Sequence, residues 1–143
     1  VARGLGTEGA ASSNDLDMFT AMRLAALLHK VQARDPRAVP ARAAVGMATI
    51  GGARALGLDG VTGSIEVGKR ADLIVVGVNG ARQTPIFDPL SHLVYVAHGS
   101  DVQHTVVNGR ILMRNRKVLS LDPAAVLSEA RAAAQAVRAA VAR

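Results

Sequence analysis

Three observations predict an α/β fold for this chain. First, a short apolar run over residues 1–7 ends at Glu8, a carboxylate flanked by glycine, and the polar cluster at residues 12–15 can start a helix. Second, the segments before residue 57 and after residue 122 are rich in Ala, with apolar residues at helical spacing. Third, short runs rich in Val and Ile, separated by Gly, fill the region between them, as expected for strands.

The first part of the chain predicts a strand end followed by two helices. Residues 12–15 offer N-caps for a helix that runs to about Ala33. Its apolar face consists of Leu16, Phe19, Met22, Ala26 and Val31. A second helix is predicted over residues 40–56, because Pro is favoured in a first turn and Gly57 can end the helix. Gly51 and Gly52 each cost roughly 1 kcal/mol relative to Ala, so they predict close packing against another element.

The strongest internal boundary follows Gly57, where the composition changes. Residues 64–67 predict a short strand, and the continuous apolar run of residues 71–76 predicts a strand buried on both faces. A short helix is predicted over residues 90–97, after an Asp-Pro pair.

A hairpin is the clearest local prediction in the second half of the chain. Its strands are residues 102–107 and 110–113, and Asn108-Gly109 between them favours a type I′ turn. A further short strand is expected at residues 118–119. From residue 122 onward the chain predicts a closing amphipathic helix.

Composition excludes several functions. The net charge of +6 is scattered, and the basic run at residues 114–117 has no aromatic neighbours to stack on bases, so no nucleic-acid partner is expected. The absence of Cys excludes disulfides, thiolate zinc sites and a cysteine nucleophile, and it fits a cytoplasmic protein. No signal peptide is found, and no apolar run approaches the ~20 residues that span a bilayer, so no membrane partner is expected.

Glu8 is the strongest candidate for chemistry. A strand would carry its side chain to the edge where ligands collect in α/β folds, and Gly9 would allow the sharp turn. The alternative is an ordinary loop carboxylate that accepts backbone N–H groups. Asp15 and Asp17 are interpreted as helix-start residues that complement the dipole. Ser12 and Ser13 are interpreted as capping residues, since no nucleophile elbow surrounds them.

The histidines and Lys69 offer no motif of their own. The four histidines are His29, His92, His98 and His104. No two of them have the spacing of an i,i+4 helical pair or a His-x-His strand pair, so a structural role is favoured over metal binding. Lys69 follows a glycine as in a phosphate loop, but a strand comes next and the motif is incomplete.

Several motifs taken together resemble the C-terminal part of the amidohydrolase superfamily. The nearest branch is that of the methylthioadenosine/S-adenosylhomocysteine deaminases and related chlorohydrolases. The motifs are GTEG at residues 6–9, SSNDLDM at 12–18, MAT at 47–49, GARALG at 52–57, GSIEVGKRADLIVV at 63–76, DPLSHLVY at 88–95 and VVNGR at 106–110. They extend over essentially the whole chain.

This resemblance implies the C-terminal portion of a (β/α)₈ TIM-barrel metallohydrolase with part of a small β-sandwich subdomain. Residues 1–56 would be the last barrel strand and its following helices, residues 57–120 the sandwich segment and residues 121–143 a C-terminal helix. A divalent metal, usually zinc, would have its histidine ligands outside this chain. By the resemblance, Glu8 would be both a metal ligand and the catalytic carboxylate that takes a proton from the attacking water.

The resemblance also implies the function. The expected activity is hydrolytic deamination of a purine-type or related ring, which is a small-molecule substrate. The rest of the barrel chain would complete the enzyme, and the resemblance suggests a homo-oligomer. The 143 residues alone are expected to be inactive. At position 8 the family pattern has Asp where this chain has Glu, and Ser13 replaces the usual Asn. The alternative is a non-catalytic assembly or interaction module that retains the amidohydrolase scaffold.

Overall fold

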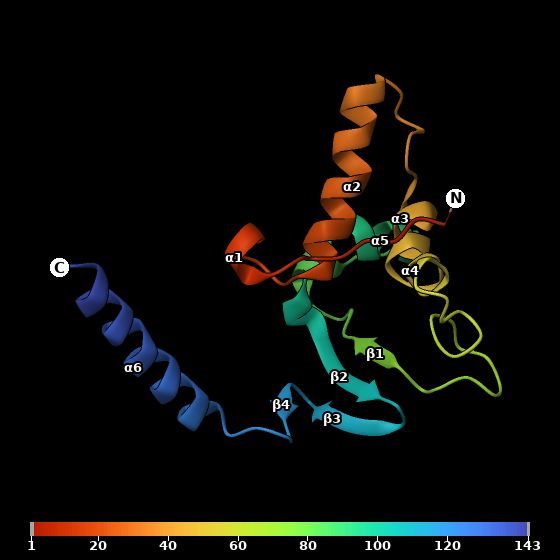
Figure 1. Cartoon of the computed structure of the whole chain (residues 1–143). Helices are drawn as coiled ribbons and strands as arrows, with labels where there is room; N and C mark the ends of the chain where they lie inside the picture. The colour runs from red at the N-terminus through yellow and green to blue at the C-terminus, as the bar shows by residue number, and fades with distance from the viewer. Residues whose placement is uncertain (1, 143) are drawn as a thin grey trace.

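The computed structural model describes residues 2–142 and contains a cluster of helices, one antiparallel sheet and a separate C-terminal helix (Figure 1). The helices are α1 (Ala10–Ser13), α2 (Met18–Ala33), α3 (Ala41–Ala48), α4 (Ile50–Ala55), α5 (Pro89–Tyr95) and α6 (Pro123–Val141). The strands are β1 (Leu73–Val76), β2 (Val102–Val107), β3 (Arg110–Arg114) and β4 (Lys117–Val118). Short 3₁₀ turns lie at Ala81–Gln83 and Gly99–Asp101.

The strand predicted at the start of the chain does not form. Val1 lies outside the described residues, and residues 2–9 have no regular secondary structure. A strand needs a neighbouring strand to pair its backbone. Here Leu5 instead donates its N–H to the Met47 carbonyl, at 3.0 Å. The first segment therefore lies against a helix end and continues into the Glu8 corner without strand pairing.

The first predicted helix begins later than expected. Asp17 is the N-cap of α2, and its carboxylate accepts the Phe19 N–H at 2.8 Å. Residues 10–13 form the separate turn α1, which ends at Asn14 in the left-handed conformation. The prediction of a single helix starting at residues 12–15 is therefore wrong, because Asp17 outcompetes that cluster as a cap. The predicted end at Ala33 is confirmed, with Arg34 as the left-handed C-cap.

The second predicted helix is broken in two at Thr49, whose φ and ψ of −127° and −105° are not helical. Helix α3 precedes this residue and α4 follows it. The break places Gly51 and Gly52 beside the first segment of the chain. A Cβ on Gly51 would lie 2.7 Å from the Arg3 carbonyl oxygen, and a Cβ on Gly4 would lie 2.8 Å from the Gly52 Cα. The close packing predicted for the glycine pair is confirmed.

Gly51→Ala is expected to destabilise the chain by about 1–3 kcal/mol, because its new methyl group would collide with two backbone carbonyls. Gly46→Ala is the matched control. It lies within α3, a Cβ there meets nothing within 4 Å, and it should stabilise the chain by up to about 1 kcal/mol. Urea unfolding of both variants measures the difference. Equal stability of the two variants would contradict this packing.

The sheet is an antiparallel meander in the order β1-β2-β3-β4. The predicted hairpin is confirmed as β2 and β3, and the positive φ values of Asn108 (49°) and Gly109 (76°) match a type I′ turn. Strand β4 confirms the short strand expected near residue 118, although it begins at Lys117. The turn between β3 and β4 uses Asn115 and Arg116, both at positive φ.

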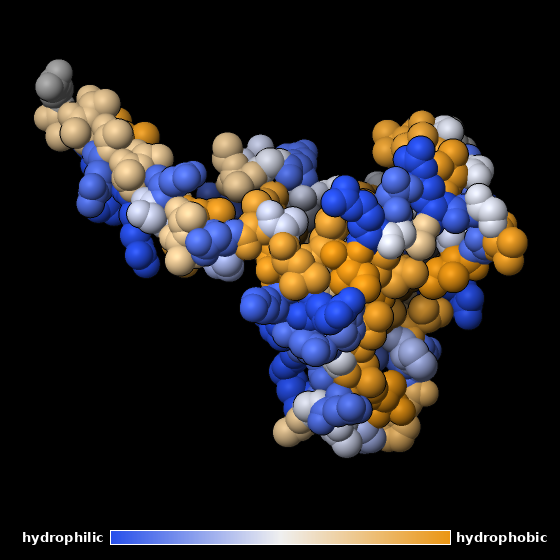
Figure 2. Space-filling model, turned by 90° about the horizontal axis from the view of Figure 1, so that it is seen from below, coloured by the Kyte–Doolittle hydropathy of each residue, from blue (hydrophilic) through white to orange (hydrophobic). Residues whose placement is uncertain are grey.

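Two strand predictions need correction. Residues 64–67 form a loop and not a strand. The ammonium group of the nearby Lys69 donates to the Ser64 hydroxyl at 2.6 Å and to Glu66 at 3.3 Å. Strand β1 is not buried on both faces, because Ile74 and Val75 are about half exposed. It lies at the edge of the only sheet among the described residues. Figure 2 shows a broad hydrophobic area on the face seen from below, and the sheet's exposed apolar side chains are Ile74, Val75, Val107 and Ile111.

The core lies between α2, α3 and α5. Its buried side chains are Phe19, Met22, Ala26, Ala41, Ala44, Val94, Ala97 and Val102. Only part of the predicted apolar face of α2 is in this core, since Leu16 and Val31 are exposed. A second apolar stripe on α2 has helical spacing and no cover among residues 2–142; its members are Leu24, Leu27, Leu28 and Val31.

Helix α6 forms as predicted but stands away from the rest of the molecule (Figure 1). Asp122 accepts the Ala124 N–H at 2.9 Å, and Pro123 occupies the first turn. None of its described residues is buried. Among residues 2–142 no helix combines the length and apolar character required to cross a membrane.

Candidate functional site

Glu8 lies on an exposed corner between the first segment and α1. Its φ of 55° is in the left-handed region, where a residue with a side chain pays about 1–2 kcal/mol. Hydrogen bonds hold the corner on both sides. The Ser13 hydroxyl reaches the Thr7 carbonyl at 3.0 Å, and the Thr7 hydroxyl donates to the Glu8 carbonyl at 3.2 Å. Strained backbone of this kind concentrates at functional sites.

The Glu8 carboxylate has no hydrogen-bond or ion-pair partner within residues 2–142. A free carboxylate in this state can be one ligand of a divalent metal or a proton acceptor. However, the described part of the chain gathers no group of three or more His, Asp or Glu side chains suited to a metal ion. The residues present therefore fit one ligand of such a metal and do not hold the ion alone.

The four histidines are not brought together. His29 on α2 places its Nδ1 2.8 Å from the Ala25 carbonyl oxygen, and His104 on β2 accepts the Asn115 N–H at 3.4 Å. His92 is buried on α5, and its Nε2 has no hydrogen-bond partner among the described atoms. His98 precedes the 3₁₀ turn before β2. The structural role favoured for these residues from the sequence stays a prediction.

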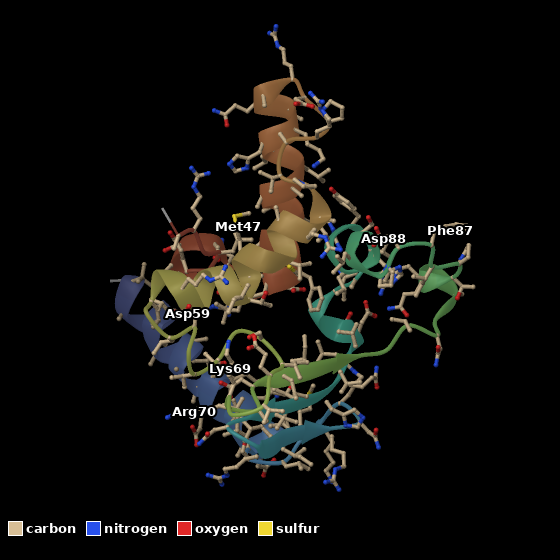
Figure 3. All side chains as sticks on the ribbon, turned by 90° about the vertical axis from the view of Figure 1, so that its right-hand side faces the viewer. Met47, Asp59, Lys69, Arg70, Phe87 and Asp88 are labelled. Atoms are coloured by element: carbon tan, nitrogen blue, oxygen red, sulfur yellow. The ribbon has the colours of Figure 1, made fainter. Side chains whose placement is uncertain are left out.

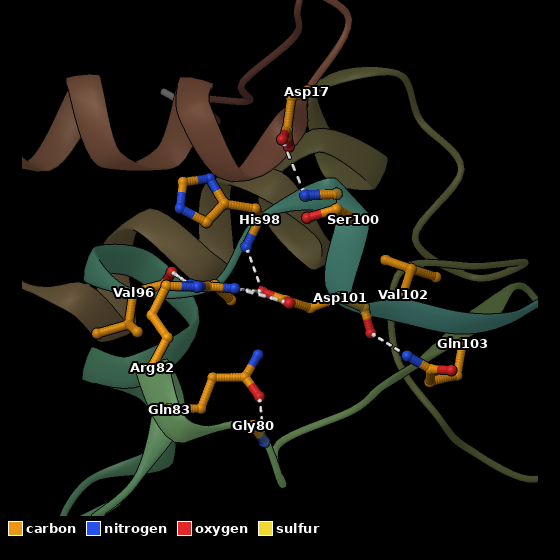
Figure 4. A network of polar contacts seen from close by, with 12 residues as sticks. Asp17, Gly80, Arg82, Gln83, Val96, His98, Ser100, Asp101, Val102 and Gln103 are labelled. Atoms are coloured by element: carbon orange, nitrogen blue, oxygen red, sulfur yellow. Dashed lines mark hydrogen bonds and ion pairs between the residues drawn. The ribbon is translucent and has the colours of Figure 1, made fainter. Parts of the chain in front are cut away.

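Asp17 has a larger role than that of a charge that complements the helix dipole. One carboxylate oxygen caps α2, and the other accepts the Gly99 N–H at 2.8 Å (Figure 4). This residue therefore joins the start of α2 to the turn that precedes β2. An open depression of about 360 Å³ lies over this junction. Its lining residues are Asp15, Leu16, Asp17, Met18, Phe19 and Gly99.

A second carboxylate completes this junction. One Arg82 nitrogen, Nη2, donates to both Asp101 carboxylate oxygens at 2.7 Å each, and Asp101 also accepts the His98 N–H at 2.9 Å (Figure 4). Arg82 also donates to the Val96 carbonyl at the end of α5. Burial raises the pKa of Asp101, but the Arg82 guanidinium and the His98 amide outweigh it and lower the pKa overall. Sequence reasoning missed this pair, because its members are distant in sequence and belong to no motif.

The motif at residues 63–76 has a structural explanation. Its Asp72 accepts the Asn108 N–H at 2.6 Å and the Thr62 hydroxyl at 2.9 Å, so it fixes the tip of the β2–β3 hairpin to the preceding loop. Lys69 and Arg70 lie on that loop, between the helices and the sheet (Figure 3). The Lys69 side chain is largely buried, and its ammonium group donates to Ser64 and Glu66. These contacts give Lys69 a structural role, which requires no phosphate loop.

Asp72 predicts a specific pH dependence. The backbone N–H of Asn108 and then the Thr62 hydroxyl lower the pKa of Asp72 in the folded state. A lowered pKa contributes stability that is fully present above the unfolded value of about 4 and is lost as the pH falls through the folded pKa. Asp72→Asn should therefore be less stable than the native chain at pH 7 and lose less stability between pH 5 and pH 3. Urea unfolding at these pH values tests this, and an identical slope in both proteins would contradict it.

Comparison with known proteins places the chain in a family. Residues 1–112 match the amidohydrolase family, and the chain belongs to it. It is 53% identical over 131 residues to the 5′-deoxyadenosine deaminase of Methanosarcina barkeri, covering 92% of this chain and 30% of that protein. It is 56% identical over 126 residues to the 5-methylthioadenosine/S-adenosylhomocysteine deaminase of Halobacterium salinarum, covering 88% of this chain and 29% of that protein.

The fold also matches a solved structure. An adenosine deaminase from Xanthomonas campestris with bound zinc has a TM-score of 0.94 and 40% identity, covering 97% of this chain and 32% of that one. The predicted family, its deaminase branch and the mixed α/β class are thereby confirmed. The chain spans about 30% of the length of the curated relatives it matches.

Proposed function

We propose that this chain is the C-terminal portion of a metal-dependent aminohydrolase, with Glu8 as its contribution to the reaction centre. The observation that carries the proposal is the Glu8 carboxylate itself, which is exposed, unpaired within residues 2–142 and held on a left-handed corner. The helix-capping carboxylates Asp88 and Asp122 accept nearby backbone N–H groups. Glu8 accepts none within residues 2–142, so its carboxylate is free to take a partner from outside them.

The reaction requires a proton acceptor close to the attacking water. In hydrolytic deamination the water oxygen bonds to the ring carbon that carries the amino group, and one water proton passes to a base. Glu8 is suited to take that proton on a carboxylate oxygen and return it to the amino group, which leaves as ammonia when the carbon–nitrogen bond breaks. Such proton transfer contributes roughly 10²–10⁴-fold in rate.

A divalent metal, with zinc as the first candidate, would supply Lewis acidity when bound. Glu8 would be one of its ligands, and the other ligands would come from outside these residues. The zinc reported in the solved relative supports this assignment. The proposed substrates are adenosine-type compounds, such as 5′-deoxyadenosine, methylthioadenosine or S-adenosylhomocysteine, because the relatives are named for them.

The remainder of a barrel would complete the site. The exposed apolar stripe on α2 and the unburied helix α6 are surfaces that such a remainder would cover. The division at residues 56/57 and 120/121, the (β/α)₈ barrel and its sandwich, the cytoplasmic location and a homo-oligomeric state stay predictions. So does the inactivity of the 143 residues alone.

The test is an ammonia-release assay on the complete enzyme, assembled from this chain and the remaining barrel, with the three adenosine-type compounds. We expect turnover that a chelator abolishes and added zinc restores. Absence of metal-dependent turnover on these and on a wider panel of amine and chloride substrates would overturn the proposal. That result would favour the non-catalytic assembly module.

A further inference from the structure

We propose that Ser13 is a positioning residue that sets the direction in which the Glu8 side chain leaves the backbone. This inference rests on the proposed role of Glu8. The Ser13 hydroxyl lies 3.0 Å from the Thr7 carbonyl oxygen, six residues back along the chain, and so closes the loop that carries Glu8. Its sequence neighbour Ser12 makes no side-chain hydrogen bond within residues 2–142. Neither serine caps α2, contrary to the interpretation from sequence.

The geometry explains why this contact controls Glu8. The two peptide planes flanking a Cα fix the direction of its Cα–Cβ bond, because each plane is rigid. Ser13 holds the carbonyl of the Thr7–Glu8 peptide, and the Thr7 hydroxyl holds the carbonyl of Glu8 at 3.2 Å. The left-handed φ of 55° is unfavourable for a residue with a Cβ, so it needs such restraints to persist on an exposed corner.

A chain of hydrogen bonds then anchors Ser13 to the folded body. The Ser13 hydroxyl has a single proton, which it shares between the Thr7 carbonyl oxygen and the Asp15 carbonyl oxygen at 2.7 Å. The Asp15 side chain accepts the Asp17 N–H at 3.0 Å. Asp17 in turn accepts the Gly99 N–H at 2.8 Å (Figure 4). These contacts attach the Glu8 corner to α2 and to the turn before β2, and both of these elements are packed into the fold.

The first test measures the backbone and needs no activity. A positive φ brings the amide proton and Hα of Glu8 close together, so NMR of the complete enzyme with isotope-labelled glutamate should show a strong cross-peak between them. Ser13→Ala should reduce this peak to the level of residues with negative φ. Ser12→Ala, the matched control, and Ser13→Asn should retain it, since an Asn amide can donate to both carbonyls. An unchanged peak in Ser13→Ala would overturn the proposal.

The second test measures catalysis in the complete enzyme. We expect Ser13→Ala to lower kcat by about 10²-fold, the loss that follows a displacement of roughly 1 Å, with a smaller change in KM. Ser13→Asn should restore kcat. A loss of kcat that Asn does not restore would overturn the proposal. If the proposed function were wrong, a Glu8 variant would instead keep full activity. The NMR comparison of the Ser13 variants does not depend on that outcome.

Discussion

Glu8→Ala is expected to lower kcat of the complete enzyme by about 10³-fold, because it removes the carboxylate proposed to move the proton between water and the leaving amine. Glu8→Gln should lose a similar factor, since the amide has nearly the same shape but cannot accept that proton. Glu8→Asp keeps the carboxylate and restores the residue of the family pattern, so its activity should be preserved or raised. Steady-state ammonia release with an adenosine-type substrate measures all three.

Glu129→Gln is the matched control for the loss of a carboxylate. Glu129 lies exposed on α6, away from the Glu8 corner, and its replacement should leave kcat unchanged. Thermal unfolding of each variant separates catalysis from stability, because Glu8 is exposed and its replacement should not change Tm. Full activity in both Glu8→Ala and Glu8→Gln would remove Glu8 from the reaction centre.

Phe19→Ala is expected to destabilise the chain by about 3–5 kcal/mol, because it leaves a cavity between α2, α3 and α5. The side chain is only 6% exposed, and the surrounding Ala and Val residues are too small to fill the space. Since folded domains are stable by roughly 5–15 kcal/mol, this is a large fraction of the total. Urea unfolding should show a lower midpoint with little change in slope.

The chain supplies its own control for this prediction. Phe87 is the only other phenylalanine and is 92% exposed, so Phe87→Ala removes the same atoms with almost no lost burial. Its effect on the free energy of unfolding should stay within about 0.5 kcal/mol. If the two variants lost equal stability, the core described here would be incorrect.

Local features of the fold were predictable because their causes are local. The Asn108-Gly109 hairpin, the Asp-Pro starts of α5 and α6 and the close packing at Gly51-Gly52 follow from turn chemistry, capping and the absence of a Cβ. The strand predicted over residues 1–7 failed for a non-local reason, since strand pairing requires a partner that residues 2–142 do not provide. The predicted start of α2 was wrong because two nearby capping sites competed, and the sequence alone does not show which of them is used.

For the site, the sequence by itself determined the candidate. A carboxylate beside Gly9 and before a cluster of polar residues pointed to Glu8, and the structure leaves that carboxylate exposed and unpaired within the described chain. Only the tertiary structure decided how the corner is held. The contacts of Ser13 with Thr7, of Asp17 with Gly99 and of Arg82 with Asp101 join backbone and side chains that folding brings together. Hydrogen bonds depend on the distance and direction between two groups in space, and the sequence alone does not give either quantity for residues that are far apart along the chain.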